Sequence, residues 1–179
     1  MTMKILIAYA TTEGQTRKIA RFCADHLIAK GASVELLPLA DLEDDDPFDI
    51  SRFDAAILAG SLHGGVLQSH LSRFAAHHAA DLSKRAGLFL MVSLAAAGND
   101  PEERADIARI ASEFAQNTGW TPSEVVHVAG AFRFTQYDFF KGLAMRWIAH
   151  SKGEVVDPQR DKEYTDWDAL AGVLDRWHG

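Results

Sequence analysis

The sequence predicts an α/β fold in which helices cover both faces of a doubly wound, five-stranded parallel sheet. Short apolar runs alternate with stripes of apolar residues at helical spacing along the whole chain. That alternation is typical of parallel strands joined by crossover helices. The runs are apolar throughout, which indicates strands buried on both faces. Five such strands in 179 residues fit the smaller doubly wound strand order, 2-1-3-4-5.

Each strand is expected where a short apolar run lies between polar or glycine-containing segments. In chain order the expected strands are residues 4–9, 33–38, 55–60, 88–94 and 124–129. The helices are expected where apolar residues recur every three to four positions. They are residues 15–30, 69–80, 101–117 and 167–177. Gly31 ends the first of these helices, and Pro101 stands where proline commonly begins one.

Length and composition limit the classes of protein that remain. The size fits one domain spanning residues 1–179, with residues 130–164 expected as an insertion between the fifth strand and the last helix. A net charge of -7 argues against nucleic-acid binding, and the acids at 43–46 are expected to form a solvated loop. The single cysteine, Cys23, excludes a disulfide scaffold. Without a recognisable secretory signal or an apolar run long enough to span a bilayer, we expect a cytoplasmic protein.

A hydroxyl-rich turn separates the first strand from the first helix. Its residues are Thr11, Thr12, Glu13, Gly14, Gln15 and Thr16. Free backbone N–H groups at a helix start attract anions, hydroxyls add hydrogen bonds, and glycine permits close approach. An ordinary capped helix is the alternative, but three hydroxyls around one glycine exceed what a cap needs. The turn therefore predicts a phosphate site.

Other kinds of site are weaker interpretations. Neither GxxxxGK nor GxGxxG occurs, which argues against a triphosphate or dinucleotide loop. Ser61 lacks the flanking glycines of a hydrolase nucleophile elbow, since Ala59 and His63 stand in their places. The histidines of one expected helix, His70, His77 and His78, have no carboxylate or further histidine at ligand spacing, so we expect no metal site.

The segment after the fifth strand is rich in aromatic residues. Six of the chain's 17 aromatic residues lie between positions 132 and 147. On a helix over 139–150, Phe140 and Trp147 fall on one apolar arc, which Lys141 and Arg146 border. An apolar face bordered by bases suits a helix in a lipid headgroup region, although packing on the domain explains the periodicity equally well.

The turn at 11–16 resembles the FMN phosphate loop of flavodoxin-like proteins. The resemblance implies that FMN lies at the switch point of the sheet. It also implies that two loops, after the third and fourth strands, hold the flavin. Here these are Ser61, Leu62, His63 and Gly64, and Ser93, Leu94, Ala95 and Ala96. Neither loop has the bulky aromatics that usually cover the ring, so one ring face would be left for a large planar substrate.

A more specific resemblance covers nearly the whole chain. The runs 129–134 and 164–167, together with the basic amphipathic helix, resemble the bacterial quinone-dependent protoporphyrinogen IX dehydrogenases, which are long-chain flavodoxin-like proteins. The resemblance implies protoporphyrinogen IX as donor, menaquinone or ubiquinone as acceptor, and peripheral association with the inner membrane surface. The residues expected to meet substrate or membrane are Arg133, Tyr137, Phe140, Lys141, Arg146 and Trp147. The chemistry would be that of the flavin, so no catalytic acid–base pair is expected.

Two other functions remain open on the sequence. A flavodoxin-type electron carrier could dock a basic partner through the acids at 43–46. An FMN-dependent quinone reductase would take its electrons from a nicotinamide, although no second nucleotide site is evident. The sequence also departs from the dehydrogenase family at Leu62 and His63, where a basic and an aromatic residue usually precede the glycine.

Overall fold

The central sheet confirms the predicted strand order. The computed structural model describes residues 2–42, 47–132 and 161–179. Five parallel strands lie in the order β2-β1-β3-β5-β6. Their bounds are β1 Lys4–Ala10, β2 Ser33–Pro38, β3 Ala55–His63, β5 Ala86–Ser93 and β6 Glu124–Ala129. In chain order of the parallel strands this is 2-1-3-4-5, so the chain has a flavodoxin-like doubly wound fold.

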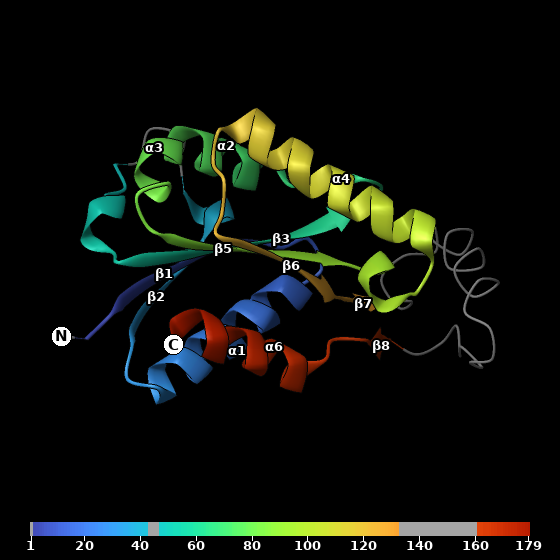
Figure 1. Cartoon of the computed structure of the whole chain (residues 1–179), viewed down its shortest axis with the longest axis horizontal. Coiled ribbons are helices and arrows are strands. Elements are labelled where there is room, and N and C mark those ends of the chain that lie inside the picture. The colour runs from blue at the N-terminus through green and yellow to red at the C-terminus, as the bar shows by residue number, and fades with distance from the viewer. Residues whose placement is uncertain (1, 43–46, 133–160) are drawn as a thin grey trace.

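Helices cover both faces of the sheet (Figure 1). On one face lie α1 (Gln15–Ala29) and α6 (Trp167–His178), which pack against each other through Phe22 and Trp167 at a centroid distance of 4.9 Å. The other face carries α2 (Ser69–His77), α3 (Ala79–Leu82) and α4 (Pro101–Thr118). Three short 3-10 helices complete the described secondary structure outside the strands: η1 (Leu39–Asp41), η2 (Ile50–Arg52) and η3 (Ala95–Ala97).

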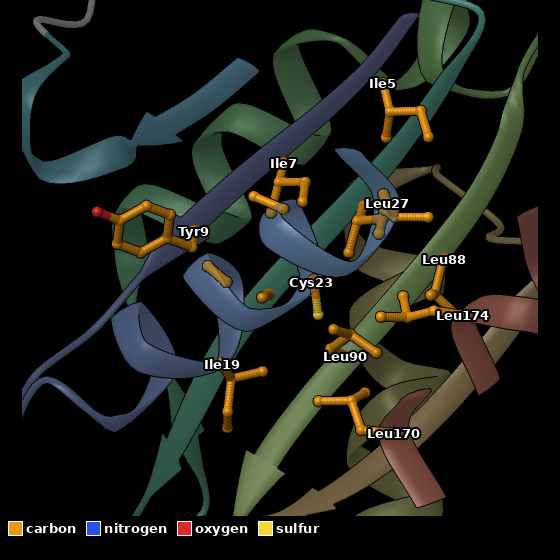
Figure 2. Close-up of a cluster of buried hydrophobic side chains, with 14 of the residues drawn as sticks. Ile5, Ile7, Tyr9, Ile19, Cys23, Leu27, Leu88, Leu90, Leu170 and Leu174 are labelled. Atoms are coloured by element: carbon orange, nitrogen blue, oxygen red, sulfur yellow. The ribbon is translucent and has the colours of Figure 1, made fainter. Parts of the chain in front are cut away.

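The core divides into two apolar clusters, one on each face of the sheet. Alternate residues of β1 point to opposite faces, so Ile5 and Ile7 join the α1/α6 cluster, while Leu6 joins the α2/α4 cluster. Figure 2 shows the first cluster, in which Cys23 of α1 and Leu174 of α6 lie over the strands. Because both faces are buried, the strands carry the continuous apolar runs that predicted them.

The third strand is longer than expected. It continues through Ser61, Leu62 and His63 and then turns back into β4 (Val66–Leu67), which pairs with it in antiparallel register. The expectation of a loop over 61–64 was therefore wrong for its first three residues. The turn itself is Gly64–Gly65, where φ values of 55° and 82° favour glycine at both positions. The next helix is also shorter than expected, since α2 ends at His77 and α3 follows.

A second, two-stranded ladder was not predicted. It pairs β7 (Ala131–Phe132) with β8 (Lys162–Glu163) in antiparallel register. Phe132 and Asp161, which flank residues 133–160, therefore lie close together at the end of the sheet where β6 ends (Figure 1). Among the described helices, none is both long enough and apolar enough to cross a bilayer.

Candidate functional site

Three of the predicted site segments meet at the carboxyl edge of the sheet. The strand register pairs Ala10 with Gly60, Ser61 with Val92, and Ser93 with Ala129. Because these strands are parallel, the residues that follow them emerge side by side at one edge. The hydroxyl-rich turn, the end of β3 and the segment after β5 are therefore neighbours, although the sequence separates them by tens of residues.

The turn at 11–16 before α1 has the backbone form expected of an anion cradle. Gly14 is the N-cap of α1 with a φ of 93°, and its N–H donates to the Thr11 hydroxyl at 2.9 Å. A side chain at position 14 would meet no atom within 4 Å, so the left-handed backbone rather than crowding calls for glycine. The first helical hydrogen bond runs from Lys18 N to the Gly14 carbonyl at 3.1 Å. The N–H groups at 15–17 consequently have no helical acceptor and carry the positive end of the helix dipole.

The side chains of this turn differ in what they do. Thr16 is only 1% exposed, and its hydroxyl has no hydrogen-bond partner among the described residues. A buried hydroxyl without a partner at a helix start fits a site that binds an anion. Thr12 is exposed and Glu13 is half-buried. The Gln15 amide nitrogen donates to Glu163 and Thr165, so this group is already engaged with the returning chain.

The two segments expected to hold a flat ring are built from small or half-buried residues. Ser61, Leu62 and His63 lie on the final part of β3, and Gly64 is in the exposed turn. At the end of β5, the buried Ser93 accepts a hydrogen bond from Ala96 N at 3.2 Å and so closes a tight turn. Leu94 caps the 3-10 helix η3, to which Ala95 and Ala96 belong.

Sequence reasoning missed Gln68, the N-cap residue of α2. Its amide donates to the Thr12 hydroxyl at 3.0 Å and to the Ser61 hydroxyl, and its carbonyl accepts from Ser61 N at 3.1 Å. Gln68 therefore joins the phosphate turn to the end of β3. No pattern in the sequence signals this contact, because Gln68 and Thr12 are 56 positions apart.

Sequence reasoning also missed Glu163, which directly precedes the family-like run at residues 164–167. Its carboxylate accepts hydrogen bonds from Gln15, from Lys18 at 2.5 Å and from the Trp167 indole at 2.9 Å. Partial burial raises the pKa of Glu163, but the three donors outweigh it and hold the pKa below its ordinary value. Thr165 completes the junction by donating to the Ala129 carbonyl at 2.6 Å. The returning chain is thus fastened to both α1 and β6.

The remaining predicted residues lie outside the part of the chain that the structure describes. These are Arg133, Tyr137, Phe140, Lys141, Arg146 and Trp147. The structure does place the two residues that flank this segment, Phe132 before it and Asp161 after it. The β7–β8 pairing holds both near Glu163, a β8 residue that accepts a hydrogen bond from the Gln15 side chain at the start of α1.

The described turn before α1 has the features expected of an anion site. Its donors are backbone N–H groups and neutral hydroxyls, which suit a phosphate monoester. Over residues 2–42, 47–132 and 161–179, no cluster of histidine, cysteine and acidic side chains could hold a metal ion.

Comparison with known proteins gives a consistent family. Residues 6–159 match the family described as "Flavodoxin domain". The protein named "Protoporphyrinogen IX dehydrogenase [quinone]" from Escherichia coli strain K12 is 28% identical over 94% of this chain and 91% of its own length. A protein of the same name from Leishmania major is 26% identical over 93% of this chain and 71% of its own. The relatives therefore include more than the bacterial ones that the sequence resemblance suggested.

A solved structure supports the fold alone. A flavodoxin from Pseudomonas aeruginosa, in a variant with one cysteine replaced by serine, superposes with a TM-score of 0.52 at 18% identity. The match covers 82% of this chain and 95% of that one.

Proposed function

The chain belongs to the flavodoxin domain family, and from that premise we propose that it oxidises protoporphyrinogen IX to protoporphyrin IX with FMN as cofactor and a membrane quinone as acceptor. Two relatives that carry this activity in their names each match at least 93% of the chain. The structural observation that carries the proposal is the junction of Glu163 and Thr165 with α1. It brings both ends of the segment assigned to substrate and membrane next to the anion cradle.

The residues of the cradle fit FMN. Thr11, Thr12 and Thr16, with the N–H groups at 15–17, would hold the phosphate, which carries only hydrogen-bond acceptors when ionised. The partnerless, buried Thr16 hydroxyl supports this assignment. Residues 61–64 and 93–96 would contact the ribityl chain and the ring, since they follow the neighbouring strands at the same edge.

When bound, FMN supplies the capacity to accept a hydride from the porphyrinogen and to return two electrons to a quinone. The contribution of the chain is to bind and orient. Small residues such as Gly64, Ala95 and Ala96 allow close approach to a planar group, and no Phe, Tyr or Trp in these two segments covers it. A ring face left open in this way suits a large, flat macrocycle.

The segment at 133–160 is proposed to complete the site. We infer that it is an insertion in one flavodoxin-like domain. Arg133, Lys141 and Arg146 would meet substrate propionates or anionic lipid, while Tyr137, Phe140 and Trp147 would provide apolar contacts. The protein would then work at the surface of the membrane that holds its quinone.

An anaerobic mixing experiment tests the function. Purified protein loaded with FMN is mixed with protoporphyrinogen IX, and the flavin absorbance is expected to bleach. Adding menaquinone or ubiquinone should restore the absorbance while porphyrin fluorescence rises. Bleaching by NADH but not by protoporphyrinogen would instead establish a quinone reductase. Reduction only by a protein electron donor would establish an electron carrier.

A further inference from the structure

We propose that Gln68 is a positioning residue that turns the Thr12 hydroxyl into a dedicated donor toward the ligand phosphate. The proposal rests on the FMN site argued above. It concerns the end of β3 and the start of α2, which Gln68 joins to the turn through Ser61 and Thr12.

The orientation of the Gln68 amide is fixed by a backbone group. Ser61 N–H can only donate, so the atom that faces it at 3.1 Å must be the Gln68 carbonyl oxygen. The NH₂ group therefore faces the other way, toward the hydroxyls of Thr12 and Ser61. Because Ser61 N–H must face an acceptor, it identifies which end of the Gln68 amide is oxygen and which is nitrogen.

Both hydroxyls consequently act as acceptors toward Gln68. An amide NH₂ has no lone pair to offer, so the Thr12 oxygen at 3.0 Å accepts, and its own proton remains available to donate elsewhere. Thr12 is exposed beside the cradle, where a phosphate oxygen is the expected acceptor. A donor oriented before the ligand arrives avoids the cost of reorientation on binding.

Packing holds the amide in this position. Gly60 precedes Ser61 on β3, and a Cβ at Gly60 would lie 3.3 Å from the Gln68 carbonyl oxygen and would overlap Leu71 Cδ2. The absence of a side chain at Gly60 therefore lets α2 approach the strand closely enough for Gln68 to reach both hydroxyls. Leu71 is fully buried, which fixes the first turn of α2 over the same strand.

The experiment measures FMN and riboflavin binding by fluorescence quenching for the wild type, Gln68→Met, Thr12→Val and the double variant. Riboflavin lacks the phosphate and reports on ring contacts, including any made through Ser61. Methionine keeps the length of the side chain but donates no hydrogen bond. We expect Gln68→Met to reduce the affinity for FMN about five- to twentyfold more than the affinity for riboflavin. That is the size expected for partial loss of a charge-assisted hydrogen bond. In the Thr12→Val background this excess should disappear.

A second variant guards against poor folding of the first. Gln68→Glu keeps the acceptor for Ser61 N–H but would accept the Thr12 proton instead of leaving it free. Its added negative charge repels the phosphate by itself, so only the part of the FMN-specific loss that disappears in the Thr12→Val background reports on the Thr12 hydroxyl. Equal losses for both flavins, or an excess that is no smaller without the Thr12 hydroxyl, would show that Gln68 is merely structural. A wild type that binds neither flavin would overturn the proposed function and this inference together, whereas wild-type binding with an unchanged FMN-to-riboflavin ratio in the variants overturns the inference alone.

Discussion

The side-chain amide of Gln15 donates a hydrogen bond to the hydroxyl of Thr165 at 3.0 Å, across 150 positions of sequence. Thr165 in turn donates to the Ala129 carbonyl at the end of β6. One short chain of hydrogen bonds thus joins the start of α1, the last strand of the sheet and the segment that leads into α6. Because Gln15 is only 6% exposed, these contacts are protected from water. The cradle and the returning chain should therefore form and loosen together.

Removing hydroxyls from the phosphate turn should weaken FMN binding. Thr12→Val and Thr16→Val each delete one donor to an anionic ligand, which costs about 1.5–3 kcal/mol, or roughly ten- to a hundredfold in affinity. Titration with FMN under fluorescence detection measures the loss. Thr121→Val serves as control, because Thr121 is exposed before β6. FMN affinity that survives both cradle substitutions would contradict the assignment.

Alanine at position 14 should strain the turn. The φ of 93° at Gly14 costs an L-residue about 1–2 kcal/mol, and no neighbouring atom adds to that penalty. Urea unfolding should show the loss, together with weaker FMN binding. Gly172→Ala is the matched control, since Gly172 lies within α6 and a Cβ there meets Arg176 at 3.7 Å. That control should stabilise the protein by about 0.5–1 kcal/mol.

Loss of the Glu163 charge should destabilise the junction in a pH-dependent way. Glu163→Gln removes the ion pair with the exposed Lys18, for which about 0.5–1 kcal/mol is expected after solvent screening. The pKa of Glu163 is lowered in the folded state. Its contribution is therefore complete above the unfolded pKa of about 4.3 and is lost as pH falls through the lower folded pKa.

The stability difference between wild type and Glu163→Gln should accordingly be constant near neutral pH and shrink in acid. Chemical denaturation at a series of pH values measures it. Glu113→Gln is a suitable comparison, because it removes a similar ion pair, with Arg109, from the exposed side of α4. A difference that grows as the pH falls would contradict the assigned role of Glu163.

The single cysteine should be unreactive in the folded protein. Burial raises the pKa of the Cys23 thiol to about 12, so almost no thiolate exists at neutral pH. An aromatic disulfide reagent should label one thiol per chain rapidly in denaturant and almost none without it. Fast labelling of the native protein would mean that α1 opens from the sheet much more often than its packing indicates.

Membrane attachment should depend on the aromatic residues of the insertion. Wild-type protein is expected to sediment with anionic vesicles at low salt, and the Phe140→Ser, Trp147→Ser double variant to remain in the supernatant while keeping its FMN. Ile28→Ser is the control, because Ile28 is an exposed apolar residue of α1, 52% accessible. A wild type that does not sediment would remove the membrane role.

Periodicity and apolar runs were enough to predict the sheet and its main helices. The strands of a doubly wound fold are buried on both faces, and that burial leaves a direct mark on the sequence, as at residues 55–60. The extension of β3 was missed because Ser61 and His63 are half-buried and do not continue the apolar run. Gly64 and Gly65 did carry a usable signal, since a Gly-Gly pair is a common hairpin turn.

The backbone form of the turn at 11–16 could be expected from the sequence, but the side-chain contacts around that turn could not. The turn at 11–16 is local, so its residue types indicate its chemistry directly. Gln68 reaches Thr12 across 56 positions and Glu163 reaches Gln15 across 148, and only the fold brings these pairs together. Whether the residues assigned to flavin contact it stays a prediction.

The β7–β8 ladder forms a stem on which one segment of the chain could be replaced by another. Ala131 pairs with Glu163 and Phe132 with Lys162, so the two ends of whatever lies between are already held adjacent by the scaffold. Closing a loop on such a stem costs little more as the loop lengthens, about 0.6 kcal/mol for each doubling. Chimeras that exchange residues 133–160 between relatives should therefore keep the sheet and the anion cradle. Under the proposed function, substrate choice and surface attachment could then change without disturbing the turn proposed to bind the phosphate.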